Sequence, residues 1–247
     1  LPQGTTGLVG RNGVGKSILA SILTKDITPT SGSVSSETTT QSFNQSSSML
    51  FEQGETIASF LGVDKQLAAL SRIENGSCED SDFELVADNW QIKENVLNIL
   101  EKLQLPANVD RPCLSLSGGE RAMLSLWMLF QSHAQLLVLD EPSNHLDKQG
   151  KAWLLNQINN YQGNVLVVSH DRELLQEVDF IYELSSLGLT FYHGAYNDYL
   201  STKINNDQSR AKQILHLKKK KLLSGIMKLS DILMKIIIMK IKRRKLI

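Results

Sequence analysis

Glycines, a lysine and a serine cluster near the start of the chain, in the segment Gly10-Arg11-Asn12-Gly13-Val14-Gly15-Lys16-Ser17. The spacing of Gly, four residues, then Gly-Lys-Ser is the P-loop pattern. Glycines let backbone N–H groups close around phosphate oxygens, and a helix that begins near Lys16 adds the positive end of its dipole. Lys16 is expected to reach the β- and γ-phosphates, and Ser17 to offer its hydroxyl to Mg²⁺. The alternative is a chance glycine-rich turn.

Three short segments that precede candidate site residues are predicted to be buried strands: 6–9, and the apolar runs 136–139 and 165–168. Continuous apolar runs are typical of parallel strands, and ligands gather at the carboxyl ends of such strands. Asp140 and Glu141 follow the second segment, and His170 follows the third. We expect Asp140 to hold Mg²⁺, Glu141 to orient or deprotonate the attacking water, and His170 to contact the γ-phosphate. The alternatives are a pair of acids at a helix start and a structural histidine.

A second helix start that could bind an anion lies in Leu116-Ser117-Gly118-Gly119-Glu120. Ser117 is placed to cap a helix predicted over about 121–131, and the glycines stand at the mouth of that helix. Alone, Ser-Gly-Gly most often marks a turn. Its place between the P-loop and the acidic strand end favours a functional interpretation.

A helical pattern separates the P-loop from the acidic strand. The clearest stripe has the spacing i, i+4, i+7, i+8 and i+11, and Pro106 ends it. The residues of this stripe are Ile92, Val96, Ile99, Leu100 and Leu103. We predict a helical subdomain over about 56–133, inserted into an α/β core, with two more short strands at 180–184 and 189–192. The polar stretch that runs to Ser48 is interpreted either as a low-complexity linker or as a surface hairpin that leads to a functional glutamine.

Composition narrows the class of protein. The 247 residues hold two cysteines, Cys78 and Cys113, which do not make a disulfide framework and suit a reducing compartment. The longest uninterrupted apolar run of the tail, 236–239, is too short to span a bilayer, so a soluble cytoplasmic protein is expected, with no stable membrane insertion. Residues 211–247 carry 12 Lys and Arg against one acid, a net +11, whereas residues 1–210 carry 14 against 25, a net −11. A basic tail on an acidic body suggests a polyanionic partner.

Together these motifs resemble the ATP-binding cassette (ABC) ATPases, in which P-loop, LSGGE, LLVLDEP and VVSHD segments follow one another in this order. The resemblance covers about residues 4–200 and implies an α/β P-loop NTPase fold that binds ATP and Mg²⁺. Finer features resemble the ABC-F subclass, soluble ATPases that carry two cassettes in one chain and commonly act on ribosomes. These features are Glu120, the segments 141–147 and 169–172, and the Tyr-x-Gly-x-Tyr-like segment 192–200.

The resemblance also implies roles that spacing alone does not give. Gln45 is the best match to the Q-loop glutamine near Mg²⁺, ahead of Gln41 and Gln53. The Ser117 to Gly119 segment would contact the γ-phosphate bound to an opposite cassette, and Asp147 would communicate across that interface. ABC sites form between two cassettes arranged head to tail, so a second cassette is implied, either another copy of this chain or a different protein.

Residues 1–200 are therefore expected to form the cassette and 201–247 a basic linker or tail, helical at first and then irregular. Basic helical residues there suit contact with ribosomal RNA phosphates. The chain departs from the family pattern because no adenine-stacking aromatic precedes Gly4 and one cassette is present instead of two. With the Ile-, Lys- and Met-rich segment after Leu223, these departures suggest a frameshifted, truncated gene product. The alternatives are the ATP-binding subunit of an ABC membrane transporter, or an inactive remnant that binds RNA through its tail.

Overall fold

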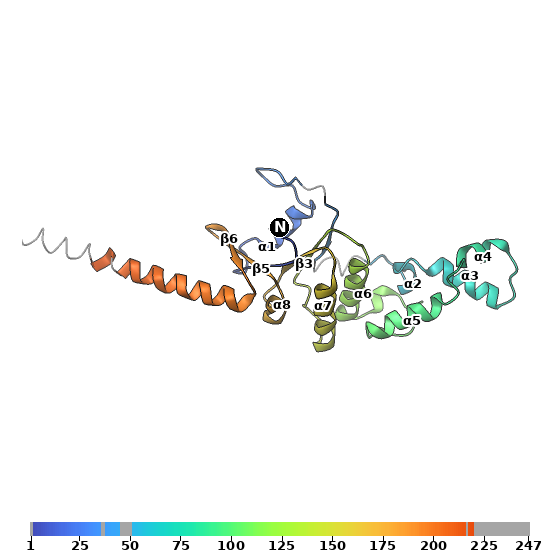
Figure 1. Ribbon diagram of the computed structural model, residues 1–247. Coiled ribbons are helices and arrows are strands. Elements are labelled where there is room, and N and C mark those ends of the chain that lie inside the picture. The colour runs from blue at the N-terminus through green and yellow to red at the C-terminus, as the bar shows by residue number, and fades with distance from the viewer. Residues whose placement is uncertain (1, 36–37, 45–50, 216, 220–247) are drawn as a thin grey trace, which may run out of the picture. The chain divides into compact units, whose positions relative to one another are not determined.

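The computed structural model describes residues 2–35, 38–44, 51–215 and 217–219. The chain divides into two compact units, Leu1–Tyr196 and Asn197–Ile247. In the second unit the described residues 197–215 and 217–219 are helical. The first unit holds the sheet, the P-loop and the segments 116–120, 141–147 and 169–172, whereas the 192–200 segment crosses the boundary between the two units (Figure 1).

A six-stranded sheet forms the centre of the first unit, in the order β2-β3-β4-β1-β5-β6. Neighbouring strands are parallel except for the antiparallel β5–β6 pair. The strands are β1 (Thr5–Gly10), β2 (Thr40–Phe43), β3 (Leu136–Asp140), β4 (Asn164–Val168), β5 (Phe180–Ser185) and β6 (Gly188–His193). Val168 of β4 is in register with Leu8 of β1 and with Asp140 of β3. The carboxyl ends of β3, β4 and β1 therefore lie next to one another.

Alternate residues of the buried strands pack against opposite layers of helix, as the period of two along a strand requires. Leu137 and Leu139 of β3 belong to the larger apolar core, which includes residues of α6 (Gly118–Phe130) and α7 (Lys148–Asn160). Val138 between them belongs to a smaller core with Ala20 of α1 (Lys16–Leu23). Figure 1 accordingly shows α1 on one side of the sheet, and α6, α7 and α8 (Arg172–Gln176) on the other.

Four helices occupy the chain between β2 and β3, before α6 begins. They are α2 (Ile57–Phe60), α3 (Asp64–Glu74), α4 (Asp80–Val86) and α5 (Ile92–Lys102). In α5, Ile92, Val96 and Leu100 are buried. Leu103, the C-cap residue of this helix, belongs to the same apolar core. A short 3₁₀ turn, Cys113–Ser115, then leads to α6. Both cysteines are free, and Cys113 is buried, which raises the pKa of its thiol to about 11.

The predicted fold class is confirmed, because the chain forms an α/β sheet with the helical insertion between β2 and β3. Two local predictions need correction. The helix predicted from Arg121 begins earlier, at Gly118, because Ser117 and Glu120 form a reciprocal capping box at its start. Within the polar stretch before Ser48, residues 40–43 form neither a linker nor a hairpin. They form β2, the edge strand of the sheet, which pairs in parallel with β3. Within the described residues, no helix has both the length and the apolar composition needed to cross a membrane.

Candidate functional site

Lys16 is a buried ammonium at the first turn of α1, with a residue exposure of 8 %. Its Nζ donates to the carbonyl oxygens of Gly10 at 3.0 Å and Arg11 at 3.3 Å, and lies 2.9 Å from Nε2 of His170. Among the described residues, no carboxylate lies within ion-pair distance of this ammonium. A buried positive charge without a negative partner is costly, so this position favours an anionic ligand.

The turn from β1 into the loop requires glycine at position 10. Its φ is +155°, and a Cβ there would lie 2.4 Å from the backbone carbonyl oxygen of Leu184 in β5. Gly15, at φ +104°, caps the start of α1. The backbone therefore bends sharply between strand and helix, and the first N–H groups of α1 open toward the loop.

The carboxyl end of β3 carries two acids with different surroundings. Oδ1 of Asp140 is buried and has no hydrogen-bond partner within the described part of the chain. Glu141 follows with a φ of +49°, a strained value for a residue with a side chain. The buried Ser169 hydroxyl donates to its Oε2 at 3.4 Å, and Nε2 of His170 lies 3.9 Å from its Oε1. Glu141 is thus held beside His170, and Asp140 presents an oxygen that lacks a donor.

These groups share one cavity of about 550 Å³, here called the P-loop cavity. Its lining residues are Asn12, Gly13, Gly15, Lys16, Ser17, Ile18, Asp140, Glu141, Asn144 and His170. Predicted loop residues Gly10, Arg11 and Val14 are absent from this lining, although two of them hold Lys16 through their carbonyls. Asn144 was not predicted to be part of the site. Its backbone N–H donates to the Glu141 carbonyl at 3.2 Å. The tight turn predicted over 142–147 could have indicated that Asn144 lies near Asp140 and Glu141.

A separate cavity of about 540 Å³, here called the pairing cavity, gathers the residues that were expected to face another cassette. Its lining residues are Leu103, Gln104, Ser117, Gly118, Gly119, Glu120, Met123, His145, Leu146, Asp147 and Gly150. Asp147 caps α7 by accepting from the N–H of Gly150 at 2.7 Å. A Cβ at Gly119 would lie 2.7 Å from the His145 carbonyl oxygen, so α6 and the turn before α7 approach closely only because position 119 is glycine.

An ion pair that the sequence did not reveal joins α7 to the end of β4. Nζ of Lys151 lies 2.6 Å from Oδ2 of Asp171, whose backbone N–H donates to Oγ of Ser169 at 3.0 Å. Burial alone would raise the pKa of the Asp171 carboxyl, but hydrogen bonds from Lys151 and from the Glu173 backbone N–H outweigh it, so the pKa lies below its usual range. The pair thus ties the first turn of α7 to the segment that carries His170.

Oxygen groups suited to a hard cation occur beside the P-loop. Ser17 and Asp140 line the P-loop cavity, and the buried Oδ1 of Asp140 lacks a donor, which fits Mg²⁺ chemistry. Groups of three or more His, Cys, Asp or Glu side chains arranged for a metal are absent from the described ranges. Gln45, the predicted third metal ligand, lies outside the described residues. The alternatives Gln41 and Gln53 are exposed and do not line the P-loop cavity.

Comparisons with known proteins agree with these motifs. A profile of the family described as ABC transporter matches residues 2–144. The ATP-binding protein YheS of Escherichia coli (strain K12) is 29 % identical over 236 residues, covering 87 % of this chain and 37 % of YheS. The energy-dependent translational throttle protein EttA of Mycobacterium tuberculosis (strain ATCC 25618 / H37Rv) is 39 % identical over 118 residues, covering 47 % of this chain and 21 % of EttA.

Among solved structures, an inward-facing metal-chelate type ABC transporter superposes with a TM-score of 0.52 at 21 % identity. The match covers 78 % of this chain and 73 % of that one, and it supports the fold. The chain spans little more than a third of the length of YheS.

Proposed function

The chain belongs to the ATP-binding cassette family, a family of ATPases whose ABC-F members include the relatives YheS and EttA, and on that premise we propose what its cavities do. The P-loop cavity binds ATP with Mg²⁺, and the pairing cavity completes the site of a second cassette placed head to tail. One observation carries the proposal: Lys16, Asp140, Glu141 and His170, which are far apart in the sequence, line a single cavity at the mouth of α1.

Each side chain has a distinct task in hydrolysis of the β–γ bond. Lys16 and the first N–H groups of α1 hold the phosphates, because both are positive and face the loop. Ser17 and Asp140 hold Mg²⁺, which offsets phosphate charge when it is bound. Glu141 orients a water toward the γ-phosphorus and accepts its proton while the bond to the β–γ bridging oxygen breaks, giving ADP and phosphate. His170, beside both Lys16 and Glu141, contacts the γ-phosphate.

The pairing cavity supports the need for a partner cassette. Ser117 caps α6 and Gly118 follows without a side chain, so the start of this helix is open to an anion. The start of α6 lines the pairing cavity, whereas Lys16 lines the P-loop cavity. One cassette therefore contributes to two different ATP sites, each of which a second cassette completes. Ribosome association of the intact protein is supported by the name of EttA, a translational throttle protein, and by the net +11 of residues 211–247.

The test is ATP turnover per mole of chain over a wide range of protein concentration. Turnover that rises with concentration and is at least about 100-fold lower in Glu141→Gln supports a self-paired site, because loss of a general base costs about 10²–10⁴-fold. Glu173→Gln, an exposed acid on α8, is the matched control and keeps its activity. An equal rate in Glu141→Gln removes Glu141 from its role. Sedimentation with ribosomes, with and without ATP, tests the proposed partner.

A further inference from the structure

Ser169 is a fully buried hydroxyl residue between the end of β4 and His170, and it lines neither the P-loop cavity nor the pairing cavity. Its Oγ accepts a hydrogen bond from the backbone N–H of Asp171 at 3.0 Å and lies 3.4 Å from Oε2 of Glu141. A hydroxyl carries a single proton. Because the Asp171 amide is a donor and cannot accept that proton, the proton points to the Glu141 carboxylate.

The Asp171 amide that orients this hydroxyl is itself held in place by the Asp171 side chain. Oδ1 of Asp171 accepts from the backbone N–H of Glu173 at 3.0 Å, which caps α8. Oδ2 accepts from Nζ of Lys151 at 2.6 Å, which ties the same residue to α7. A donor fixed from two sides holds the Ser169 hydroxyl in one orientation.

The Glu141 backbone is fastened to β4, but its carboxylate has few contacts. The Glu141 N–H donates to the carbonyl of Val168 at 2.8 Å, directly before Ser169. Nε2 of His170 lies 3.9 Å from Oε1, beyond hydrogen-bonding distance. Among the described residues, Ser169 is the only one whose side chain hydrogen-bonds this carboxylate. The 3.4 Å separation is long for an O–H···O bond, and hydrogen bonds at catalytic sites often tighten when the substrate binds.

We propose that Ser169 is a positioning residue for Glu141: its hydroxyl holds Oε2, so that Oε1 faces the attacking water and accepts its proton. This inference rests on the proposed function, because that function assigns the water to Glu141. Ser169 itself touches no ligand in the P-loop cavity, since it does not line that cavity. Loss of its hydroxyl therefore changes where the carboxylate points and leaves the contacts that bind ATP in place.

The first test separates kcat from KM for ATP with the full 247-residue chain. Ser169→Ala is expected to lower kcat at least about tenfold, because a small misplacement of a catalytic group costs up to about 100-fold, and to leave KM unchanged within about twofold. Thr6→Val is the matched control. It removes a hydroxyl of β1 that is also buried and has no hydrogen-bond partner in the described structure, and it keeps both constants. An equal loss of kcat in both variants overturns the proposal.

A double-mutant cycle tests whether Ser169 acts through Glu141. In single-turnover measurements with the chain in excess over ATP, adding Ser169→Ala to Glu141→Gln is expected to change the residual rate by less than about twofold, because no carboxylate remains to be positioned. A further loss of about tenfold or more would assign Ser169 a role apart from Glu141 and overturns the proposal.

Crystal structures of the unaltered chain and of Ser169→Ala test the positioning without any turnover. The Glu141 carboxylate is expected to keep one position beside Ser169 in the unaltered chain and to move or become disordered in the variant. An unchanged carboxylate in Ser169→Ala overturns the proposal. So does a separation of more than about 3.5 Å between Oγ and Oε2 in the unaltered chain, a measurement that needs no variant to fold. Absence of turnover in the unaltered chain would instead count against the proposed function alone.

Discussion

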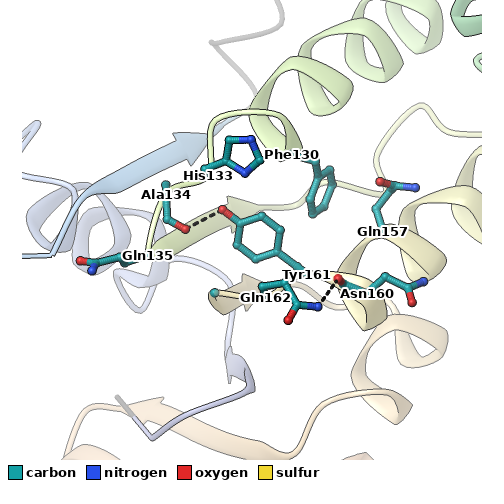
Figure 2. Close-up of a pocket in the computed structure, with 9 residues that line it drawn as sticks. Phe130, His133, Ala134, Gln135, Gln157, Asn160, Tyr161 and Gln162 are labelled. Atoms are coloured by element: carbon teal, nitrogen blue, oxygen red, sulfur yellow. Dashed lines mark hydrogen bonds between the residues drawn. The ribbon is translucent and has the colours of Figure 1, made fainter.

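The carboxyl ends and the amino ends of the parallel strands hold cavities of different chemistry. At the carboxyl ends of the strands, the P-loop cavity contains a buried ammonium without a carboxylate beside it and an acid whose Oδ1 has no donor in the described structure. At the amino ends of β3 and β4, a cavity of about 390 Å³ has no Asp, Glu, Lys or Arg in its described lining, and the Tyr161 hydroxyl and Nδ2 of Asn160 donate to neighbouring oxygens (Figure 2). The first cavity holds charged side chains, whereas the second is lined mainly by amide and aromatic side chains.

The difference follows from the direction of the helices. Strands β1, β3 and β4 are parallel, and the helices between them return in the opposite sense. The N-termini of these helices, with open N–H groups, therefore lie at the carboxyl ends of the strands. Their C-termini, with open carbonyls, lie at the amino ends. The same topology thus places helix N–H groups at the carboxyl ends of the strands and helix carbonyls at their amino ends. Variants at the carboxyl ends test what this arrangement contributes there.

The largest expected effect comes from Gly10→Ala. Its Cβ would meet the Leu184 backbone oxygen at 2.4 Å in a left-handed conformation, so we expect the free energy of unfolding to fall by about 2–5 kcal/mol. Urea unfolding measures it. Gly118→Ala is the matched control, because a Cβ there meets nothing within 4 Å and alanine favours the helix. Similar stability of the two variants would show that the strand-to-loop turn does not need glycine.

Removing the charge of Lys16 tests whether that edge is built for an anion. We expect Lys16→Met to bind a fluorescent ATP analogue about 10- to 100-fold more weakly, the usual weight of a hydrogen bond to a charged group. The ligand-free chain should lose only the hydrogen bonds from Nζ to the Gly10 and Arg11 carbonyls, about 1–3 kcal/mol, because no carboxylate lies within ion-pair distance of the ammonium in the described structure. Lys148→Met, at the exposed start of α7, serves as control. Unchanged ATP affinity in Lys16→Met would contradict the anion site.

The site at the carboxyl ends of the strands was largely predictable from sequence because each of its motifs lies within a short segment of the chain. The P-loop lies within eight consecutive residues, and Asp140 and His170 each follow a continuous apolar run. Because ligands gather at the carboxyl ends of parallel strands, the residues that follow these runs were expected to form one site. The start of α6 was placed late because helix propensity of Gly118 and Gly119 is low, whereas the capping box of Ser117 and Glu120 decides the boundary.

The rest depends on contacts between distant residues that no local pattern records. Strand β2 is polar and short, and its pairing with β3 decides its conformation. The cavity at the amino ends of β3 and β4 is lined by the last turns of α6 and α7, which the chain separates by an entire strand. Lys151 and Asp171, twenty residues apart, meet only after α7 has packed beside β4.

The smallest expected effect concerns the ion pair of Lys151 and Asp171. This pair links α7, whose start lines the pairing cavity, to the segment that carries His170. Although burial would raise the pKa of the Asp171 carboxyl, hydrogen bonds from Lys151 and from the Glu173 backbone N–H hold it below its usual value of 3.8, so the stabilisation is fully present above about pH 4 and is lost as pH falls through the folded pKa. Lys151→Met should lower the free energy of unfolding at pH 7 by about 0.5–1 kcal/mol, since the lysine is partly exposed. The difference in stability from the unaltered chain should narrow as pH falls through the folded pKa of Asp171, and Lys148→Met should show no difference. A gap that persists unchanged in acid would mean that Lys151 acts through the packing of its methylenes, and the electrostatic link between the two cavities would be lost.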